Sequence, residues 1–474
     1  MKHAVILLAL VVTACSGDDV MTPEQLQDPN TCVQCHPDHH TEWSGSMHAY
    51  ASDDPVFIAM NKRGQRETNG ELGLFCVNCH APMAVANGTL TKDNVADFDP
   101  TQLMPGERGI TCYFCHNIKE VTQDHNNGLV VAMDSTMRGG LRDPIDSPAH
   151  HTKYDPLLDS DQTNSDFCGS CHDVVNGHEV RVERSFVEWQ ASIFGNPEIP
   201  ERNLSCGGCH MESRFGLVAD APGLGTTVRA ERAVHSHMFP GIDLALVPFP
   251  EMDAQAAAVQ EFLDSSLTIR GPIPRTGPSD APGGICLDPP GNISVRIDNI
   301  GSGHSWPSGA AFDRRAWLEV IAYRTDGSVV FQSGVVPDDM DPEEIGDPNL
   351  LGLWDQVFKP DGSPAHFFWD IARSDPSWLL KGPITNDPND PAFDHSITKT
   401  YTNVPNISDI ERITARVRIR PLPLVVLRDL VASGDLADGF DTKLKTLDVK
   451  GATKVWERAT AGTGNAENTN CSPR

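Results

Sequence analysis

The sequence feature that most constrains this chain is a cysteine pattern that occurs five times in its first half. Each copy has two cysteines separated by two residues, with a histidine directly after the second cysteine. Histidine accounts for 18 of the 474 residues, so five such histidines would coincide by chance with odds on the order of one in ten million. The copies, numbered here motifs 1 to 5, are CVQCH (32–36), CVNCH (76–80), CYFCH (112–116), CGSCH (168–172) and CGGCH (206–210).

This spacing suits covalent attachment of haem. Two thiols on one turn of chain can add to the two vinyl groups of the porphyrin, and the adjacent histidine can bind the iron from the same side. We therefore predict five haem c groups, each with one proximal histidine. The predicted thioether cysteines are Cys32, Cys35, Cys76, Cys79, Cys112, Cys115, Cys168, Cys171, Cys206 and Cys209. The predicted proximal iron ligands are His36, His80, His116, His172 and His210.

Two other uses of paired cysteines fit less well. A zinc ribbon needs two CxxC pairs for each metal ion and no histidine beside them. A thiol–disulfide exchange motif belongs to a βαβ context, which the surrounding sequence does not show.

The N-terminus predicts export. One lysine precedes an apolar run from Ala4 to Val12, which is too short to span a bilayer and is typical of a signal peptide. The run closes with VTAC, which resembles a bacterial lipobox, so residues 1–14 are predicted to be removed and Cys15 to carry lipid. An ordinary signal peptide is the alternative. We expect a protein anchored by lipid at the bacterial outer membrane, on its periplasmic or cell-surface side, with residues 15–31 as a tether.

The charge balance limits the partners. The formal net charge is −28, which argues against binding to nucleic acid and to anionic lipid surfaces. We expect contact with the membrane through the lipid anchor only. Redox proteins or an external electron acceptor are the predicted partners.

The remaining chain predicts an α+β protein with a loop-rich, short-helix five-haem domain (32–250) followed by a β-sandwich-like domain (286–474). Glycine, proline, asparagine and aspartate interrupt the first domain throughout, so the haems themselves must supply its core. Residues 251–285 are predicted to hold a helix (252–266) and a Pro/Gly-rich linker (271–284).

The second domain shows an alternating pattern. Apolar and polar residues alternate over 292–300, 316–334 and 411–421, and Asp326-Gly327 predicts a hairpin turn. A late helix is expected over 424–435, and the acidic stretch 337–349 is expected to form a surface loop. Cys286 and Cys471 flank this domain and are predicted to form a disulfide, with two free thiols as the alternative.

Each iron has a second axial position. A distal histidine there gives a low-spin electron carrier, whereas an open position allows chemistry on a bound molecule. Removing His3 and the motif histidines leaves 12 candidates: His39, His40, His48, His125, His150, His151, His178, His235, His237, His304, His366 and His395.

Four stretches contain most of these histidines: CVQCHPDHHTEWSGSMHAY (32–50), SPAHHTKYDPLLDSDQTNSDFCGSCHDV (147–174), HSHMFPGID (235–243) and NIGSGHSWPSGAAFDRRAWLEV (299–320). They resemble multihaem c-type cytochromes of the cytochrome c-554 and hydroxylamine-oxidoreductase-like group. The resemblance implies distal ligation by His48, His150 (with His151 as a close rival), His237 and His304. His125, in the polar loop after motif 3, is the fifth candidate. The pairing of distal histidines with haems stays open.

The sequence also contains a partial internal repeat. EWSGS (42–46) follows motif 1, and EWQAS (188–192) follows motif 4. Both are predicted to be short helices whose tryptophans either pack between helices or line a haem.

Two functions from different classes fit these features. The first is an exported electron carrier with mostly bis-histidine haems. The alternative is a multihaem reductase or oxidase that acts on a small nitrogen or sulfur compound at one five-coordinate haem. The CxxCK motif, which resembles the signature of pentahaem nitrite reductases, is absent. A haem protein that polymerises into a surface filament is a third interpretation, which nothing in the sequence requires.

Overall fold

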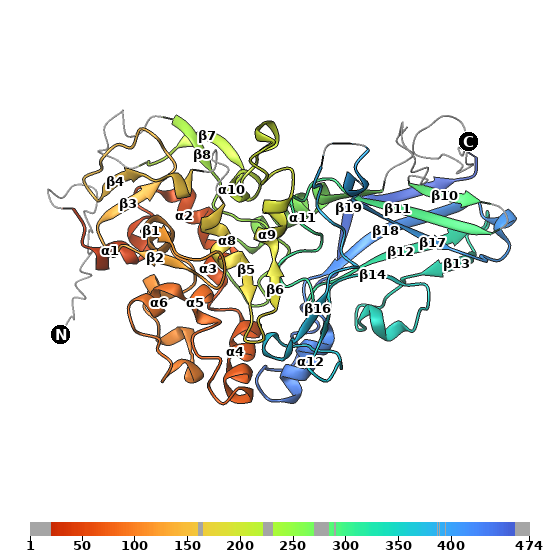
Figure 1. Cartoon of the computed structure of the whole chain (residues 1–474), viewed down its shortest axis with the longest axis horizontal. Helices are drawn as coiled ribbons and strands as arrows, with labels where there is room; N and C mark the ends of the chain where they lie inside the picture. Colours follow the sequence, from red (N-terminus) through yellow and green to blue (C-terminus); the bar gives the residue numbers. More distant parts are fainter. Residues whose placement is uncertain are drawn as a thin grey trace, which may run out of the picture.

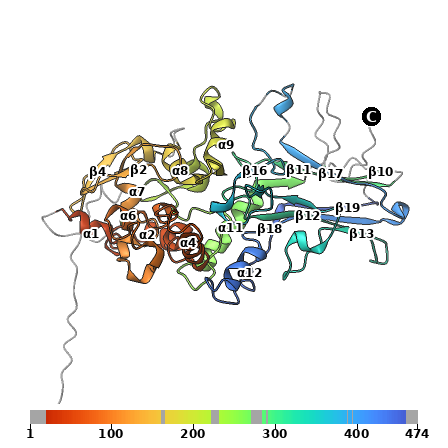
Figure 2. The ribbon, with the colours of Figure 1, turned by 60° about the horizontal axis from the view of Figure 1, so that its bottom comes forward.

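A computed structural model describes residues 20–159, 165–220, 231–269, 284–288, 291–385, 387, 389–393 and 395–459. The chain forms two parts that lie side by side (Figure 1). Short helices and small strand pairs make up the part that carries the motifs, and long strands make up the other part, as the second view also shows (Figure 2). Both segment types occur together, so the predicted α+β class is confirmed.

The motif-bearing part is built from short helices, most of them a single turn or two. They are α1 (Pro23–Gln27), α2 (Pro37–Ser44), α3 (Met47–Tyr50), α4 (Pro55–Glu67), α5 (Val77–His80), α6 (Pro82–Ala86), α7 (Cys112–His116), α8 (Asp166–His172), α9 (Ser185–Ala191) and α10 (Cys206–His210). Prolines begin α1, α2, α4 and α6, where a missing backbone N–H costs nothing. These four helices therefore start at fixed points of the chain.

Two-stranded pairs fill the space between these helices. They are β1 (Ile118–Val121) with β2 (Leu129–Val131), β3 (Thr136–Gly139) with β4 (His151–Tyr154), β5 (Asp173–Val175) with β6 (Arg181–Arg184), and β7 (Ser213–Leu217) with β8 (Glu231–His235). The pair of β3 and β4 is parallel and the others are antiparallel. No sheet of this part has more than two strands among the residues that the structure describes, which fits a region with little core of its own.

The predicted tether is partly a packed element. Helix α1 lies within residues 15–31, where its N-cap Thr22 forms a capping box with Gln25. Leu26 of this helix is buried against Met83 and Tyr113. Packing of this leucine thus fixes the chain just before motif 1. The predicted signal peptide and Cys15 lie outside the described residues.

The β-rich part contains two main sheets. The first has the order β10 (Ile285–Asp288), β11 (Asn292–Asn299), β17 (Ser396–Tyr401), with β9 (Leu267–Ile269) also on β11. The second has the order β13 (Val329–Ser333), β12 (Arg315–Tyr323), β18 (Arg412–Arg420), β19 (Leu447–Glu457), with β14 (Leu351–Leu353) also on β12. Outside them, β15 (Gln356–Phe358) pairs with β16 (Arg373–Asp375).

One hydrophobic core joins the two sheets. Ile293, Val295 and Ile297 of β11 belong to the same buried cluster as Leu318 of β12 and Val417 of β18. This arrangement is a two-layer packing of sheets, as the alternating patterns predicted. The predicted hairpin is confirmed, since β12 pairs antiparallel with β13 around Gly327 at φ +83°.

Two helices complete this part and match their predicted positions closely. They are α11 (Met252–Ser266) and α12 (Leu424–Ala432). Strand β9 starts directly after α11, inside the segment predicted as helix and linker, because Leu267 and Ile269 pair with β11 and are fully buried. No helix among the described residues is long and apolar enough to cross a membrane.

The two parts share a buried contact between helices α4 and α12. Val56 and Ala59 of α4 belong to the same cluster as Val426, Leu427 and Leu430 of α12. Both views place these helices next to each other at one edge of the molecule (Figures 1 and 2). Burial of apolar surface there holds the β-rich part against the motif-bearing part.

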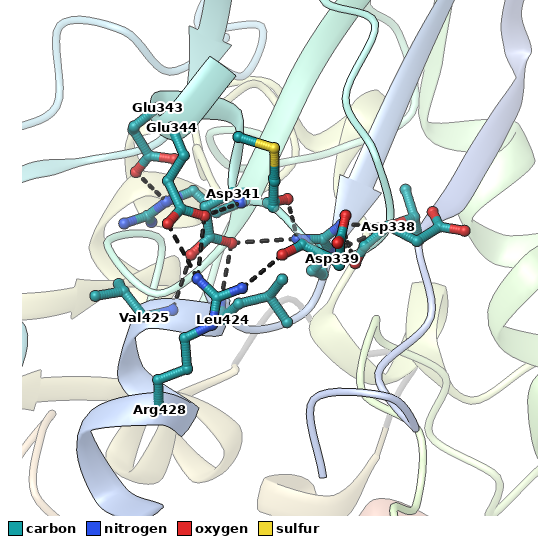
Figure 3. A network of polar contacts seen from close by, with 12 residues as sticks. Asp338, Asp339, Asp341, Glu343, Glu344, Leu424, Val425 and Arg428 are labelled. Carbon is teal, nitrogen blue, oxygen red and sulfur yellow. Dashed lines mark hydrogen bonds and ion pairs between the residues drawn. The ribbon is translucent and has the colours of Figure 1, made fainter. Parts of the chain in front are cut away.

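The acidic stretch 337–349, predicted as a surface loop, anchors α12. The side chain of Asp341 is 3% exposed and accepts hydrogen bonds from the backbone N–H groups of Leu424 and Val425 at 2.9 and 2.8 Å. It also pairs with buried Arg420 at 3.2 Å (Figure 3). The residue before the helix is Pro423, which has no side-chain acceptor, so a carboxylate from another segment satisfies the helix N-terminus.

Replacing Asp341 by alanine should therefore destabilise the protein strongly. The change leaves Arg420 buried without its carboxylate and two helix N–H groups without an acceptor, so we expect a loss of about 3–5 kcal/mol in the free energy of unfolding. Denaturant titration followed by circular dichroism measures it. Asp339→Ala is the matched control, because Asp339 is exposed and offers Arg428 its backbone carbonyl. Equal stability of the two variants would contradict this assignment.

Candidate functional site

The motifs place two thiols and one imidazole on a single turn of chain. In motif 1 the amide of His36 donates to the carbonyl of Cys32 at 2.8 Å, and in motif 2 His80 donates to Cys76 at 3.2 Å. Motifs 3, 4 and 5 lie within helices α7, α8 and α10. This is the local geometry that two thioether bonds and an axial ligand from the same side require.

Four of the five motif histidines are oriented by a backbone carbonyl. Nδ1 donates to Val218 in His36 (2.6 Å), Ala51 in His80 (3.0 Å), Arg138 in His116 (2.5 Å) and Pro240 in His210 (2.9 Å). A carbonyl can only accept, so Nδ1 carries the proton and Nε2 keeps its lone pair. Metal-bound histidines commonly have this arrangement, in which the second nitrogen fixes the ring.

Four motif histidines each face one histidine from a distant segment. The ring centres are 6.3 Å apart for His36 and His150, 6.1 Å for His172 and His48, 6.2 Å for His116 and His237, and 6.5 Å for His210 and His304. The four partners stand at positions 48, 150, 237 and 304, for which the resemblance implies distal ligation.

The separations match the space that one iron needs. A metal–imidazole bond is about 2.0 Å long and each ring centre lies about 1.15 Å beyond its nitrogen, so two rings on opposite sides of one iron are about 6.3 Å apart. The interplanar angles of 18° to 53° are allowed, since each ring can rotate about its own iron–nitrogen bond. The residues present therefore fit a haem iron between each pair.

Three of the rings that face the motif histidines are also held by a backbone carbonyl at Nδ1. Nδ1 of His150, His237 and His304 lies 3.1, 3.0 and 2.9 Å from a backbone carbonyl. Burial lowers the pKa of His48 and His237 to about 3 and that of His36, His172 and His210 to about 4. These imidazoles are neutral at ordinary pH, which is the form that binds a metal.

Ring separation alone does not define a ligand pair. His39 lies 6.2 Å from His36, but it follows three residues later on the same segment, so the chain cannot pass around a porphyrin to bring it to the opposite face. His151 is exposed, whereas its neighbour His150 faces His36.

Motif 2 differs from the others. The ring of His80 is stacked on Phe57 of α4 at 4.0 Å and 1°, and among the described residues no histidine ring contacts it. The predicted fifth distal ligand, His125, lies instead in the turn between β1 and β2, where Nδ1 bonds Asp124 at 2.7 Å and the side chain is 32% exposed. The structure does not bring His125 to any motif histidine, because its polar loop faces solvent.

Thiols of different motifs contact one another. The Cys112 thiol lowers the pKa of Cys32, the Cys79 thiol raises that of Cys171, and the Cys206 thiol raises that of Cys168. Motif 1 therefore lies beside motif 3, and motif 4 lies beside both motif 2 and motif 5. Cys115 of motif 3 also acts on Cys168 and Cys171, so motif 3 lies near motif 4.

Two of the cysteines that the structure describes take part in disulfides. Cys286 is one of them, and Cys471, the partner predicted for it, lies outside the described residues. Cys35 is the other. A sulfur in a disulfide cannot form a thioether, so the predicted haem attachment at motif 1 requires Cys35 in its reduced form.

Sequence reasoning missed the phenylalanine at motif 2. Phe57 lies in a helix of ordinary amphipathic pattern, which gives no signal for a contact with a ring more than twenty residues away. The backbone carbonyls that orient the histidines could not be predicted either, because they belong to residues distant in sequence from the motif histidine, such as Val218 for His36 and Pro240 for His210.

Comparisons with known proteins find similarity to cytochromes in part of the sequence and in the fold. The family model for cytochrome c554 and c-prime matches residues 31–117. The structure is similar to that of a penta-heme cytochrome c552 from Thermochromatium tepidum, with a TM-score of 0.55 at 16% identity over 90% of this chain and 97% of that chain. No curated protein matches the chain. In its five CxxCH motifs, in residues 31–117 and in its fold, the chain is similar to multihaem c-type cytochromes.

Replacing His304 by alanine should leave one haem iron with a single axial histidine. We expect one low-spin signal to be lost and a high-spin ferric signal to appear, as measured by electron paramagnetic resonance and optical spectra of the oxidised protein. His125→Ala is the matched control and should leave both spectra unchanged. A high-spin signal in the control, or none in His304→Ala, would count against the pairing.

Proposed function

We propose that this protein holds five haem c groups and transfers electrons, with four irons bound by two histidines and the fifth by one. The observation that carries the proposal is the set of four histidine pairs at 6.1–6.5 Å. A haem iron cycles between ferric and ferrous forms and so accepts and releases one electron. An iron with two histidine ligands keeps its coordination in both forms, which suits a carrier.

The protein contributes the fixed surroundings. Backbone carbonyls hold the imidazoles through Nδ1, and burial keeps these rings neutral. Axial ligands, hydrogen bonds to them and burial are the means by which a protein sets the potential of an iron.

The contacts between motifs support a continuous route. The attachment points of motifs 1 and 3 adjoin, motif 3 lies near motif 4, and motif 4 also adjoins motifs 2 and 5. Motif 4 is thus a branch point, with neighbours on three sides. An electron that enters near motif 1 can leave near motif 2 or motif 5 without crossing a gap between attachment points.

Location and partners belong to the same proposal. The N-terminal sequence supports export and attachment of lipid at Cys15, which holds the protein at the bacterial outer membrane. Its partners are redox proteins or an external electron acceptor. The net charge of −28 favours a partner with a basic docking surface.

A second function is favoured by motif 2. His80 lacks an opposing histidine among the described residues, so a haem attached at motif 2 would have His80 as its one histidine ligand and could bind a small molecule. The protein would then be a haem oxidoreductase that acts on a small nitrogen or sulfur compound at this one position, with the other haems delivering or removing electrons.

Carbon monoxide should bind the reduced protein at one haem in five. It binds ferrous haem at an open axial position and competes poorly with a second histidine. The measurement is the carbon-monoxide difference spectrum, normalised to total haem by a pyridine haemochrome assay. His150→Ala should raise the fraction to two in five, which calibrates the signal.

Two results would separate the candidates. If wild-type protein binds no carbon monoxide, the single-histidine assignment of motif 2 is wrong and every iron has two ligands. If it binds carbon monoxide at one haem, and the reduced protein without carbon monoxide is reoxidised rapidly by nitrite or hydroxylamine, the second function is supported over a carrier alone.

A further inference from the structure

The repeated Glu-Trp-x-x-Ser stretches, 42–46 and 188–192, have the same set of contacts in both copies. In each copy the serine hydroxyl donates to the tryptophan carbonyl at 2.7 Å and closes the end of a short helix. The first copy ends α2 and the second ends α9. The repeat is therefore a structural unit as well as a sequence pattern.

The tryptophan of each copy holds the segment that leads into a motif. The indole N–H of Trp43 donates to the carbonyl of Ile110 at 2.8 Å, and that of Trp189 donates to Leu204 at 2.9 Å. Each acceptor lies two residues before the first cysteine of its motif, motif 3 for Ile110 and motif 5 for Leu204. Both copies thus grip a motif at the same point.

The glutamate of each copy holds the segment that carries a distal histidine. Oε2 of Glu42 accepts the backbone N–H of His237 at 2.9 Å, and Oε2 of Glu188 accepts that of Ser305 at 2.9 Å. Ser305 directly follows His304 and its carbonyl accepts from Nδ1 of that histidine at 2.9 Å. Each carboxylate therefore acts on the backbone at or beside an iron ligand.

The two glutamates have the same surroundings. Each side chain is 21% exposed, and Oε1 of each lies near an arginine, at 2.9 Å from Arg214 for Glu42 and 3.4 Å from Arg184 for Glu188. The arginine fixes one carboxylate oxygen and leaves the other for the backbone N–H. Hydrogen bonds of this charge-assisted kind are about twice as strong as neutral ones.

In each copy, the hydrogen bonds of the tryptophan and of the glutamate act on the two segments of one histidine pair. Trp43 holds motif 3, and Glu42 holds His237, the histidine that faces motif 3 at 6.2 Å. Trp189 holds motif 5, and Glu188 holds the loop of His304, which faces motif 5 at 6.5 Å. In each copy, a glutamate and the tryptophan that follows it thus connect the segments of two facing histidines.

We propose that Glu42 and Glu188 are positioning residues that hold the distal histidines of motifs 3 and 5 at ligand distance. Trp43 and Trp189 hold the segments that lead into these motifs, so each Glu-Trp pair acts as a clamp on one histidine pair. The inference rests on the proposed function, since it assumes that these histidine pairs bind iron. The other two pairs, His36 with His150 and His172 with His48, have no such stretch, so the effect is confined to two haems.

The experiment uses the haem-loaded protein and four variants: Glu42→Ala, Glu188→Ala, His237→Ala and His304→Ala. Removal of the carboxylate frees the backbone N–H, so amide exchange at His237 or Ser305 should become about tenfold faster. The low-spin resonance signal that His237→Ala abolishes should be the one that Glu42→Ala shifts or weakens. Glu188→Ala should do the same to the signal that His304→Ala abolishes.

Two controls separate positioning from general loss of structure. Glu42→Gln and Glu188→Gln keep an acceptor oxygen and should restore the signals in large part. Glu201→Ala removes an exposed glutamate near motif 5 and should change neither exchange nor spectrum.

Three other outcomes would contradict the proposal. If the glutamate variants alter exchange but no haem signal, or both alter the same signal, the clamps do not position ligands. If the histidine variants change their signals and the glutamate variants do not, the proposed ligation stands and the clamps fail. If the histidine variants leave every signal intact, the ligation and the inference fail together.

Discussion

The interaction on which this structure depends is the facing of two imidazole rings from distant segments, 6.1–6.5 Å apart in each of four pairs. A porphyrin is too wide for neighbouring residues to reach both of its faces, so each pair must join segments that are far apart in sequence. His36 meets His150 and His172 meets His48, and these connections cross the whole motif-bearing part. Short helices and two-stranded pairs are sufficient there because these histidine pairs and the haems proposed between them, and not a large apolar core, define which segments lie together.

Under the proposed function, the same constraint makes the β-rich part a component of the redox unit. His304 comes from the loop after β11 and faces motif 5, while Arg314, directly before β12, pairs with Asp243 of the other part at 2.5 Å. Helices α4 and α12 add a shared apolar cluster. A sandwich of two sheets is a rigid support, and a ligand that extends from it has a fixed position relative to its own core.

The sequence predicted the features that have strong local signals. The motifs, the helix at 252–266, the alternating strands and the α+β class all follow from spacing or periodicity over a few residues. The pairing of histidines could not be predicted, because it depends on how distant segments fold together. His125 is the fifth candidate from the sequence, yet it bonds Asp124 in a turn where its side chain is 32% exposed. Asp341 lies in a stretch whose acidic composition suggested a solvent-exposed loop, and tertiary contacts with Arg420 and α12 bury it instead.

The exception at motif 2 is connected to the rest of the molecule through α4. Successive residues of this helix have different roles: Val56 packs into the cluster shared with α12, and Phe57 stacks on the ring of His80. Stacking on Phe57 and the bond from Nδ1 to Ala51 together fix the His80 ring, which no other histidine ring faces among the described residues. The packing between the two parts therefore determines where α4 lies, and α4 in turn determines how the His80 ring is held.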